Sequence, residues 1–115
     1  MRPSRFYSSR QEKHIAKAVG GRKTPNSGAT KWAKGDIVSE DWLFEAKTHT
    51  EPRQSFTIRR EWIEKMNEEA FQSGKHHTAL VIDFGDGEQF YLISEREFLD
   101  LKEARDEIIS GEVSP

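Results

Sequence analysis

The chain has 115 residues, the usual size of one domain, with 34% hydrophobic and 33% charged residues. Its twelve aromatic residues are enough for a compact core, and the absence of cysteine excludes disulfide scaffolds, thiolate metal sites and cysteine nucleophiles. No apolar run approaches the roughly 20 residues of a membrane helix and no secretory signal is visible at the start, so we expect one soluble intracellular domain over residues 1–115, without a membrane partner.

The formal net charge of −2 hides an uneven distribution along the chain. Residues 1–34 carry nine lysines and arginines and one acid, a local net charge of +8. Residues 35–115 carry nine basic and nineteen acidic residues, a local net charge of −10. A basic end on an acidic body is typical of a protein that binds a polyanion, and we favour nucleic acid. A solubilising tail would have the same composition, so charge alone leaves that alternative open.

The first predicted element is a helix over Ser9–Val19. Ser9 and Glu12 have the spacing of a capping box, and the glycine pair that follows the segment ends it. Residues 20–35 are rich in glycine, lysine and turn-forming residues and predict a loop. Residues 1–34 are therefore expected to form a basic helix followed by a basic loop.

The rest of the chain alternates predicted strands and helices. Ile37-Val38 and Trp42–Phe44 flank a polar turn and predict a hairpin. The elements after it are, in order, a strand over Ser55–Ile58, a helix over Arg59–Ser73, a strand buried on both faces over Thr78–Phe84, a tight turn at Asp86-Gly87, a strand over Gln89–Ile93 and a helix over Glu95–Ile109. This order, α-β-β-β-α-β-β-α, predicts an α/β fold in which helices flank a mixed sheet.

Three ionisable residues around the predicted hairpin stand out, namely Asp36, Glu45 and Lys47. Glu45 and Lys47 are two apart on a strand, so their side chains leave the same face. If the hairpin pairs Ser39 with Trp42, Asp36 lies opposite Glu45, and two carboxylates in that relation destabilise a sheet. A divalent cation between them would remove the repulsion, because carboxylate oxygens are ligands that Mg²⁺ prefers. Lys47 would then orient a water or stabilise charge that develops on a phosphate.

The alternative is a purely structural role for these charges. In that interpretation Glu45 and Lys47 decorate a solvated strand face and Asp36 caps a turn. Charged residues two apart on a strand are common, so the spacing alone does not decide between the two. The basic, glycine-rich loop directly before Asp36 favours the metal site, because it would deliver a phosphate to the metal.

The order Gly35-Asp36 followed by Glu45-Ala46-Lys47 resembles the core motif of the PD-(D/E)XK nuclease superfamily. The resemblance spans about Ser9–Phe84, which is most of the chain. At the position where the motif usually has a proline, this sequence has Gly35.

The context of the motif is similar to phage and archaeal-type Holliday junction resolvases. It consists of the helix that carries Glu12, the Asn26-Ser27-Gly28 turn, and Ser55 at the start of a strand before an amphipathic helix. The resemblance implies a restriction-endonuclease-like αβββαβ core with flanking helices. It also implies a cytoplasmic protein of a bacterium, an archaeon or a phage-infected host.

The activity implied by the resemblance is metal-dependent hydrolysis of DNA phosphodiester bonds, leaving a 5′-phosphate and a 3′-hydroxyl. Asp36 and Glu45 would bind Mg²⁺ or Mn²⁺ together with the backbone carbonyl of Ala46. Lys47 would help to activate the attacking water. Glu12 would complete the acidic site as a fourth catalytic residue and a further ligand, although the capping box already offers another explanation for an acid at this position.

Candidate DNA contacts are basic, polar or aromatic residues around the N-terminal helix, the loop and the start of the predicted third strand. They are Arg10, Arg22, Lys23, Ser27, Lys31, Trp32, Lys34 and Ser55. Contacts from the basic loop would be independent of sequence, because they would go to phosphates. A solvated loop is the alternative for the cations, and a place in the core is the alternative for the tryptophan.

The expected substrate is branched DNA, above all the four-way junction. Paired nicks need two active sites, so we expect a homodimer with a two-fold axis, and Phe98, Leu101 and Ile108 are candidate interface residues unless they belong to the core. A nickase or a repair nuclease would use the same site. Two rivals lack catalysis: a DNA-binding module of the same fold, and an adaptor whose basic arm binds another protein.

Overall fold

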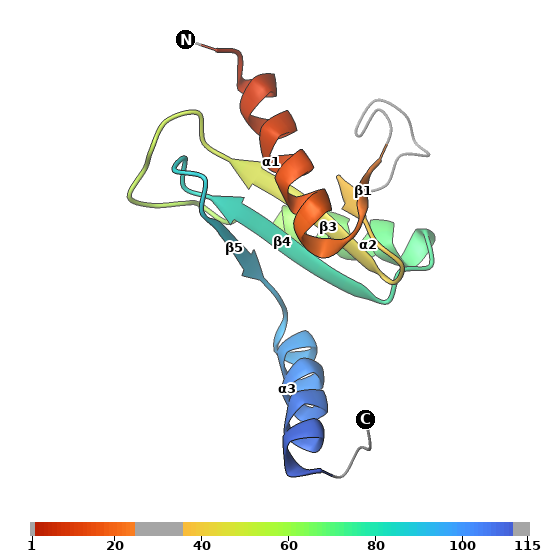
Figure 1. The fold of residues 1–115 in the computed structure, drawn as a ribbon. Helices are drawn as coiled ribbons and strands as arrows, with labels where there is room; N and C mark the ends of the chain where they lie inside the picture. The colour runs from red at the N-terminus through yellow and green to blue at the C-terminus, as the bar shows by residue number, and fades with distance from the viewer. Residues whose placement is uncertain (1, 25–35, 112–115) are drawn as a thin grey trace.

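The computed structural model of the chain describes residues 2–24 and 36–111. These residues form three helices and a five-stranded sheet (Figure 1): α1 (Ser4–Val19), β1 (Arg22–Lys23), β2 (Ile37–Val38), β3 (Trp42–Thr48), α2 (Arg60–Gln72), β4 (His77–Asp83), β5 (Gln89–Leu92) and α3 (Glu95–Ser110). The expected α/β character with a mixed sheet is confirmed. None of the helices in this described part is long and apolar enough to cross a membrane.

The strands lie side by side in their chain order, from β1 at one edge to β5 at the other. All neighbours pair antiparallel except β3 and β4, which are parallel from Trp42↔His77 to Thr48↔Asp83. A parallel pair needs a crossover connection, and α2 provides it. β3 therefore lies in the interior of the sheet, between a local partner, β2, and a distant one, β4.

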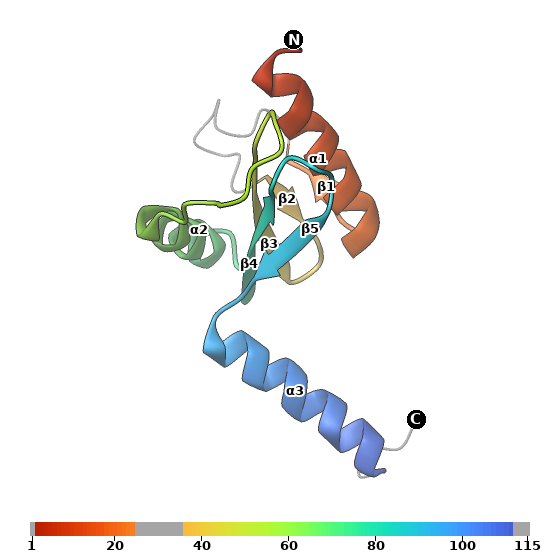
Figure 2. The same ribbon diagram turned by 90° about the vertical axis from the view of Figure 1, so that its left-hand side faces the viewer.

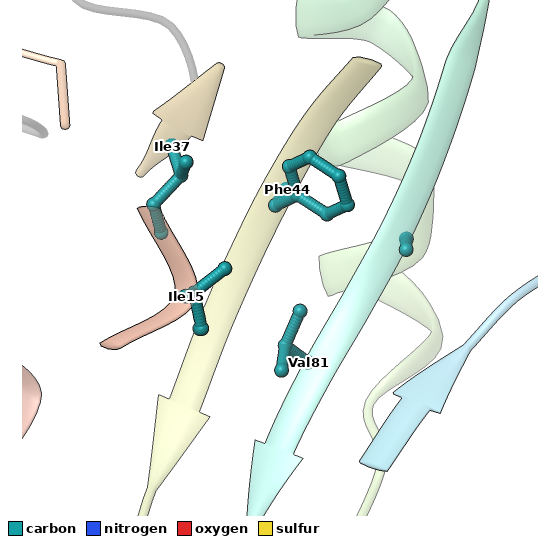
Figure 3. Packing of buried hydrophobic residues seen from close by; sticks show 5 residues of the cluster. Ile15, Ile37, Phe44 and Val81 are labelled. Atoms are coloured by element: carbon teal, nitrogen blue, oxygen red, sulfur yellow. The ribbon is translucent and has the colours of Figure 1, made fainter. Parts of the chain in front are cut away.

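Each face of the sheet is covered by one helix, with α1 on one side and α2 on the other (Figure 2). Figure 3 shows the core under α1, where Ile15 packs against Ile37, Phe44 and Val81. The core under α2 contains Leu43, Val38, Leu80, Met66 and Ala70. Successive residues of β3 thus point to opposite cores, and Glu45, two residues after Leu43, is directed to the α2 face.

Helix α1 begins at Ser4, five residues before the predicted start. Pro3 is the N-cap, with φ −60° and no side-chain hydrogen bond to the first turn. The proline ring fixes φ at a value that suits a helix start, so no polar cap is required. The predicted capping box is therefore wrong, because Ser9 and Glu12 both lie inside the helix.

The predicted strand over Ser55–Ile58 is also absent, since the described chain runs without regular structure from β3 to α2. β3 and β4 each have a partner strand on both sides, so the segment over Ser55–Ile58 cannot pair with either of them. Its Phe56 packs instead against His49, with ring centroids 4.5 Å apart, and against Phe84 at 5.9 Å. Three strands nevertheless precede α2, as predicted, because β1 pairs with β2 and replaces the strand expected over Ser55–Ile58 in the element order.

Two loops at the carboxyl ends of β3 and β4 pack against each other. Gly85 has φ +103°, and a Cβ at this position would lie 2.3 Å from the backbone oxygen of Glu51. The Arg53 N–H donates to the carbonyl of Phe84 at 2.8 Å. The turn expected at Asp86-Gly87 is part of a longer loop whose backbone N–H groups at Gly85 and Gly87 donate to the Asp83 carboxylate.

Candidate functional site

The acidic pair predicted in the hairpin forms. The ladder pairs Ile37 with Phe44, and the Ser39 N–H donates to the carbonyl of Trp42 at 3.0 Å, so Asp36 falls beside Glu45. Oδ2 of Asp36 accepts a hydrogen bond of 2.8 Å from the backbone N–H of Ala46. The Asp36 carboxylate also acts on Glu45, since it raises the pKa of that side chain, so the two acids form a repelling pair.

The acidic pair holds a proton for a clear electrostatic reason. The pKa of Glu45 is raised to about 8, mainly by burial and in addition by the carboxylates of Asp36 and of Glu69 on α2, while Lys47 lowers it. Like charges at such short range cannot both ionise in a partly desolvated site. The pair therefore holds one proton at neutral pH when no cation is present.

The oxygen atoms around this pair fit a hard divalent cation. In an extended strand the N–H and C=O of one residue point to the same side, so the Ala46 carbonyl is directed to the side where its N–H meets Asp36. Two carboxyl groups and a carbonyl are ligands that Mg²⁺ or Mn²⁺ accepts, with water and phosphate oxygens as the remainder. Within residues 2–24 and 36–111, no three histidine or acidic side chains converge to hold a metal by themselves.

Lys47 leaves β3 on the same face as Glu45, as its spacing predicts. Its Nζ lies 4.5 Å from the ring centroid of Trp62 on α2. A cation over the face of an indole ring is attracted by the negative charge of that face. Trp62 thus positions the lysine, a role that its place in the predicted helix over Arg59–Ser73 does not indicate.

Glu12 approaches the pair from α1. Burial and the Asp36 carboxylate both raise the pKa of Glu12, which shows that the two acids interact, while Lys23 lowers it. The Lys23 Nζ lies 3.5 Å from Oε1 of Glu12 and donates to the hydroxyl of Ser9 at 3.3 Å. With the capping role excluded, Glu12 is an acid on the inner side of α1 that has Lys23 as its counterion.

Gln11 was missed by the sequence analysis. Its side chain is buried, and Nε2 donates to the backbone carbonyl of Lys47 at 2.9 Å and to Oε1 of Gln89 at 3.0 Å. The signal in the sequence is its position four residues before Ile15, which places it on the apolar stripe of α1. Glu69 was missed as well, because only the tertiary fold brings α2 over Glu45.

The candidate DNA contacts lie on two sides of this site. Arg10 is exposed on α1, with its guanidinium near the rings of Phe6 and Tyr7, and Arg22 is exposed on the edge strand β1. Lys23 is half-buried against Glu12, whereas Ser55 is exposed in the connection to α2. Four further candidates lie outside the described residues, namely Ser27, Lys31, Trp32 and Lys34.

No protein-family model, curated protein or solved structure matches this chain. The interpretation of the site therefore depends on its own geometry and electrostatics, together with the motif in the sequence.

Proposed function

We propose that the chain is a metal-dependent DNA endonuclease with a restriction-endonuclease-like core, which resolves four-way junctions by paired nicks. The observation that carries the proposal is the half-buried pair of Asp36 and Glu45, two acids that the pairing of β2 with β3 brings side by side. A sheet gains nothing from opposed acids at this position, so the pair is best explained by the ion that would separate them.

Each residue of the site then has a role. Asp36, Glu45 and the carbonyl of Ala46 bind the ion, which supplies a Lewis acid and a template for water and phosphate when it is bound. Lys47, held by Trp62, orients the attacking water and stabilises charge on the phosphate. Glu12 adds negative charge from α1 and sets the position of Lys23.

The surface around the site supports a polyanionic substrate. Arg10 is an exposed cation on α1, the helix that also carries Glu12. Arg22 is an exposed cation on β1, which pairs with β2, the strand that begins directly after Asp36. Cations of this kind bind phosphates without regard to sequence. Junction preference comes from the resemblance to resolvases, and the experiment below tests it separately from cleavage.

The test is a cleavage assay on a labelled four-way junction and a linear duplex of matched sequence. Each substrate is incubated with Mg²⁺, with Mn²⁺, with EDTA, and with the Asp36→Asn variant in Mg²⁺. We expect symmetric paired nicks in the junction alone, lost under EDTA and in the variant.

Two other results would correct the proposal. Metal-dependent cutting of both substrates would retain the nuclease and remove its junction specificity. Tight binding without cutting under any of these conditions would instead make the chain a DNA-binding module, and the acidic pair would be structural.

A further inference from the structure

Four aromatic rings form a continuous row beside the end of β3. We call them the aromatic row, which consists of His49, Phe56, Phe84 and Phe90. The ring centroids are 4.5 Å apart from His49 to Phe56, 5.9 Å from Phe56 to Phe84, and 5.8 Å from Phe84 to Phe90. Figure 1 shows that the connection from β3 to α2 and the turn from β4 to β5 lie at the same end of the sheet. The row joins these two segments to the edge strand β5.

The aromatic row lies on the face of the sheet that carries Glu45 and Lys47. His49 follows Lys47 by two residues, the spacing that keeps side chains on one face of an extended chain. Leu92 packs against the core under α2, so Phe90, two residues before it on β5, faces the same side. The proposed metal site and the row are therefore neighbours on one surface.

The aromatic row is open to solvent on its outer side. None of its four rings is fully buried, and Phe90 is 46% exposed. Helix α2 packs against β3 and β4, whereas Phe90 lies on the edge strand. The two loops that carry the row are already held together through their backbones, because the Arg53 N–H donates to the carbonyl of Phe84. Aromatic surface that is left partly open in this way is available to a ligand with a flat face.

The segment that leads into α2 adds positive charge to this surface. Residues 50–60 contain three arginines and one acid, whereas the chain from residue 35 to its end is acidic overall. Arg53, Arg59 and Arg60 are all exposed. The ion pairs of Arg59 and Arg60 with acids of α2 are exposed as well, at 3.9 and 3.6 Å, and pairs of this kind are weak. Aromatic rings beside exposed cations are typical of surfaces that bind single-stranded nucleic acid, since bases stack on the rings and the cations contact phosphates.

The acidic residues of the turn between β4 and β5 face their own loop. The buried carboxylate of Asp83 accepts hydrogen bonds from the backbone N–H groups of Gly85 and Gly87. The carboxylate of Asp86 accepts from the N–H of Glu88 at 3.0 Å. These donors hold both carboxylates toward the loop, so the arginines provide the approach for a polyanion.

We infer that the aromatic row binds unpaired nucleotides of the DNA strand that is cut, with their bases stacked on its rings and their phosphates along the arginines. Stacking requires a free base face, which a continuous duplex offers only at its ends, so the row distinguishes branched DNA with unpaired nucleotides from duplex. Ser55, an expected DNA contact, is exposed directly before Phe56 in this segment. The inference deepens the proposed function and rests on it for the identity of the polymer.

The experiment measures binding without cleavage, by fluorescence anisotropy of the full chain in EDTA. Two labelled DNAs share one sequence, a continuous duplex and the same duplex with a bulge of unpaired thymines. We expect the wild type to bind the bulged DNA about tenfold more tightly, the size expected from stacking one or two bases. Phe90→Ala should remove most of this preference and leave the affinity for duplex unchanged. Phe71→Ala is the matched control, because Phe71 is 86% exposed but lies on α2 outside the row, and it should behave like the wild type.

A second readout reports stacking directly. A fluorescent adenine analogue placed in the bulge should be quenched when the wild type or Phe71→Ala binds, and less so with Phe90→Ala. Phe56→Leu keeps apolar bulk and removes a ring, so it should also lower the preference for bulged DNA.

Three results would overturn the inference. They are equal affinity of the wild type for the two DNAs, an equal loss of both affinities in Phe90→Ala, and a Phe90→Ala variant that keeps the preference. If the first result came with self-association that Phe90→Ala abolishes in sedimentation, the row would be a contact between copies of the chain. Because EDTA prevents cleavage, each of these failures leaves the proposed nuclease intact. A chain that prefers bulged DNA but never cuts would retain the row and refute the nuclease.

Discussion

Nε2 of Gln11 lies 2.9 Å from the backbone carbonyl oxygen of Lys47, and this hydrogen bond fixes α1 to the strand that carries the candidate site. Because Gln11 and Glu12 are neighbours in the helix, the same contact sets the depth at which Glu12 approaches Asp36. A residue that touches none of the proposed reacting groups thus determines how α1 and β3 meet.

Replacing Gln11 by methionine keeps the length of the side chain and removes its donors. We expect the loss of about 1–3 kcal/mol in the free energy of unfolding, because the buried carbonyl of Lys47 loses a partner. Cleavage should fall by about tenfold at saturating DNA, with little change in binding. Urea unfolding and single-turnover cleavage measure the two effects. Gln72→Met, at the exposed end of α2, is the control and should change neither. A wild-type rate in Gln11→Met would contradict the positioning role.

Glu45→Gln separates chemistry from binding. The amide keeps the shape of the side chain but is a poor ligand for a divalent cation, so cleavage should drop by at least a hundredfold. DNA affinity should stay within about threefold, because the exposed cations are unchanged. Glu88→Gln, in the exposed loop before β5, is the matched control. If Glu45→Gln cuts at the wild-type rate, the assignment of the site is wrong.

Stability of the metal-free protein should depend on pH through the same side chain. The pKa of Glu45 is raised from 4.5 to about 8 on folding, so its contribution is fully present below pH 4.5 and is lost as the pH rises toward 8. In EDTA we expect the melting temperature to fall between pH 5 and pH 8. Glu45→Gln should flatten that slope, and a slope that is unchanged in the variant would contradict the proton held by the acidic pair.

Addition of Mg²⁺ should reverse the trend. Binding of the ion requires an ionised carboxylate and releases the proton, so the ion should raise the melting temperature more at pH 8 than at pH 5. Thermal unfolding with 10 mM Mg²⁺ and with EDTA, in matched buffers, is the measurement. Equal stabilisation at both values of pH would argue against this pair as the ligand.

Trp62 should support Lys47 through its ring and not only through its size. We expect Trp62→Leu to lower the cleavage rate and to reduce the free energy of unfolding by about 1–2 kcal/mol. Trp62→Phe should have values between those of Trp62→Leu and the wild type, because a phenyl ring still attracts a cation. The pH profile of cleavage distinguishes the role, since a structural defect alone would leave its shape unchanged. Ile63→Val on the same helix is the control.

Arg22 and Lys23 should contribute unequally to DNA binding although they are neighbours. Arg22 is exposed, whereas the charge of Lys23 is already partnered by Glu12. Arg22→Gln should therefore reduce the slope of log K against log salt by about 1, and Lys23→Gln by less. Filter binding over a range of NaCl concentrations measures both. Equal slopes for the wild type and Arg22→Gln would remove β1 from the interface.

Much of the fold was predictable because its signals are local. Helix α2, strand β4 and helix α3 end within two residues of their predicted bounds, since apolar periodicity and glycine stops mark them. The facing of Asp36 and Glu45 also followed from counting along a hairpin. The end of α1 at Val19 was predicted correctly, but its start was not, because Pro3 and not Ser9 is the N-cap. The strand predicted over Ser55–Ile58 was wrong, because β3 and β4 already have partner strands on both sides.

The rest of the site was not predictable because it depends on contacts between distant segments. Because β3 and β4 are parallel, α2 must cross one face of the sheet to connect them. Only this crossover brings Trp62 to Lys47 and Glu69 to Glu45. On the other face, the sequence does not distinguish Gln11 from an ordinary polar residue, because its hydrogen bond to Lys47 exists only when α1 packs on the sheet. A single sequence contains the residues of such a site but not the crossover that assembles them.

The order in which β3 acquires its neighbours has a kinetic consequence. Its pairing with β2 is local and can form early, whereas β4 follows only after the whole of α2. The early hairpin brings Asp36 and Glu45 together before α2 and β4 have packed around them. In metal-free solution above pH 8 that step opposes two full negative charges, so the chain should refold more slowly there than at pH 6. A divalent cation present from the start would accelerate it.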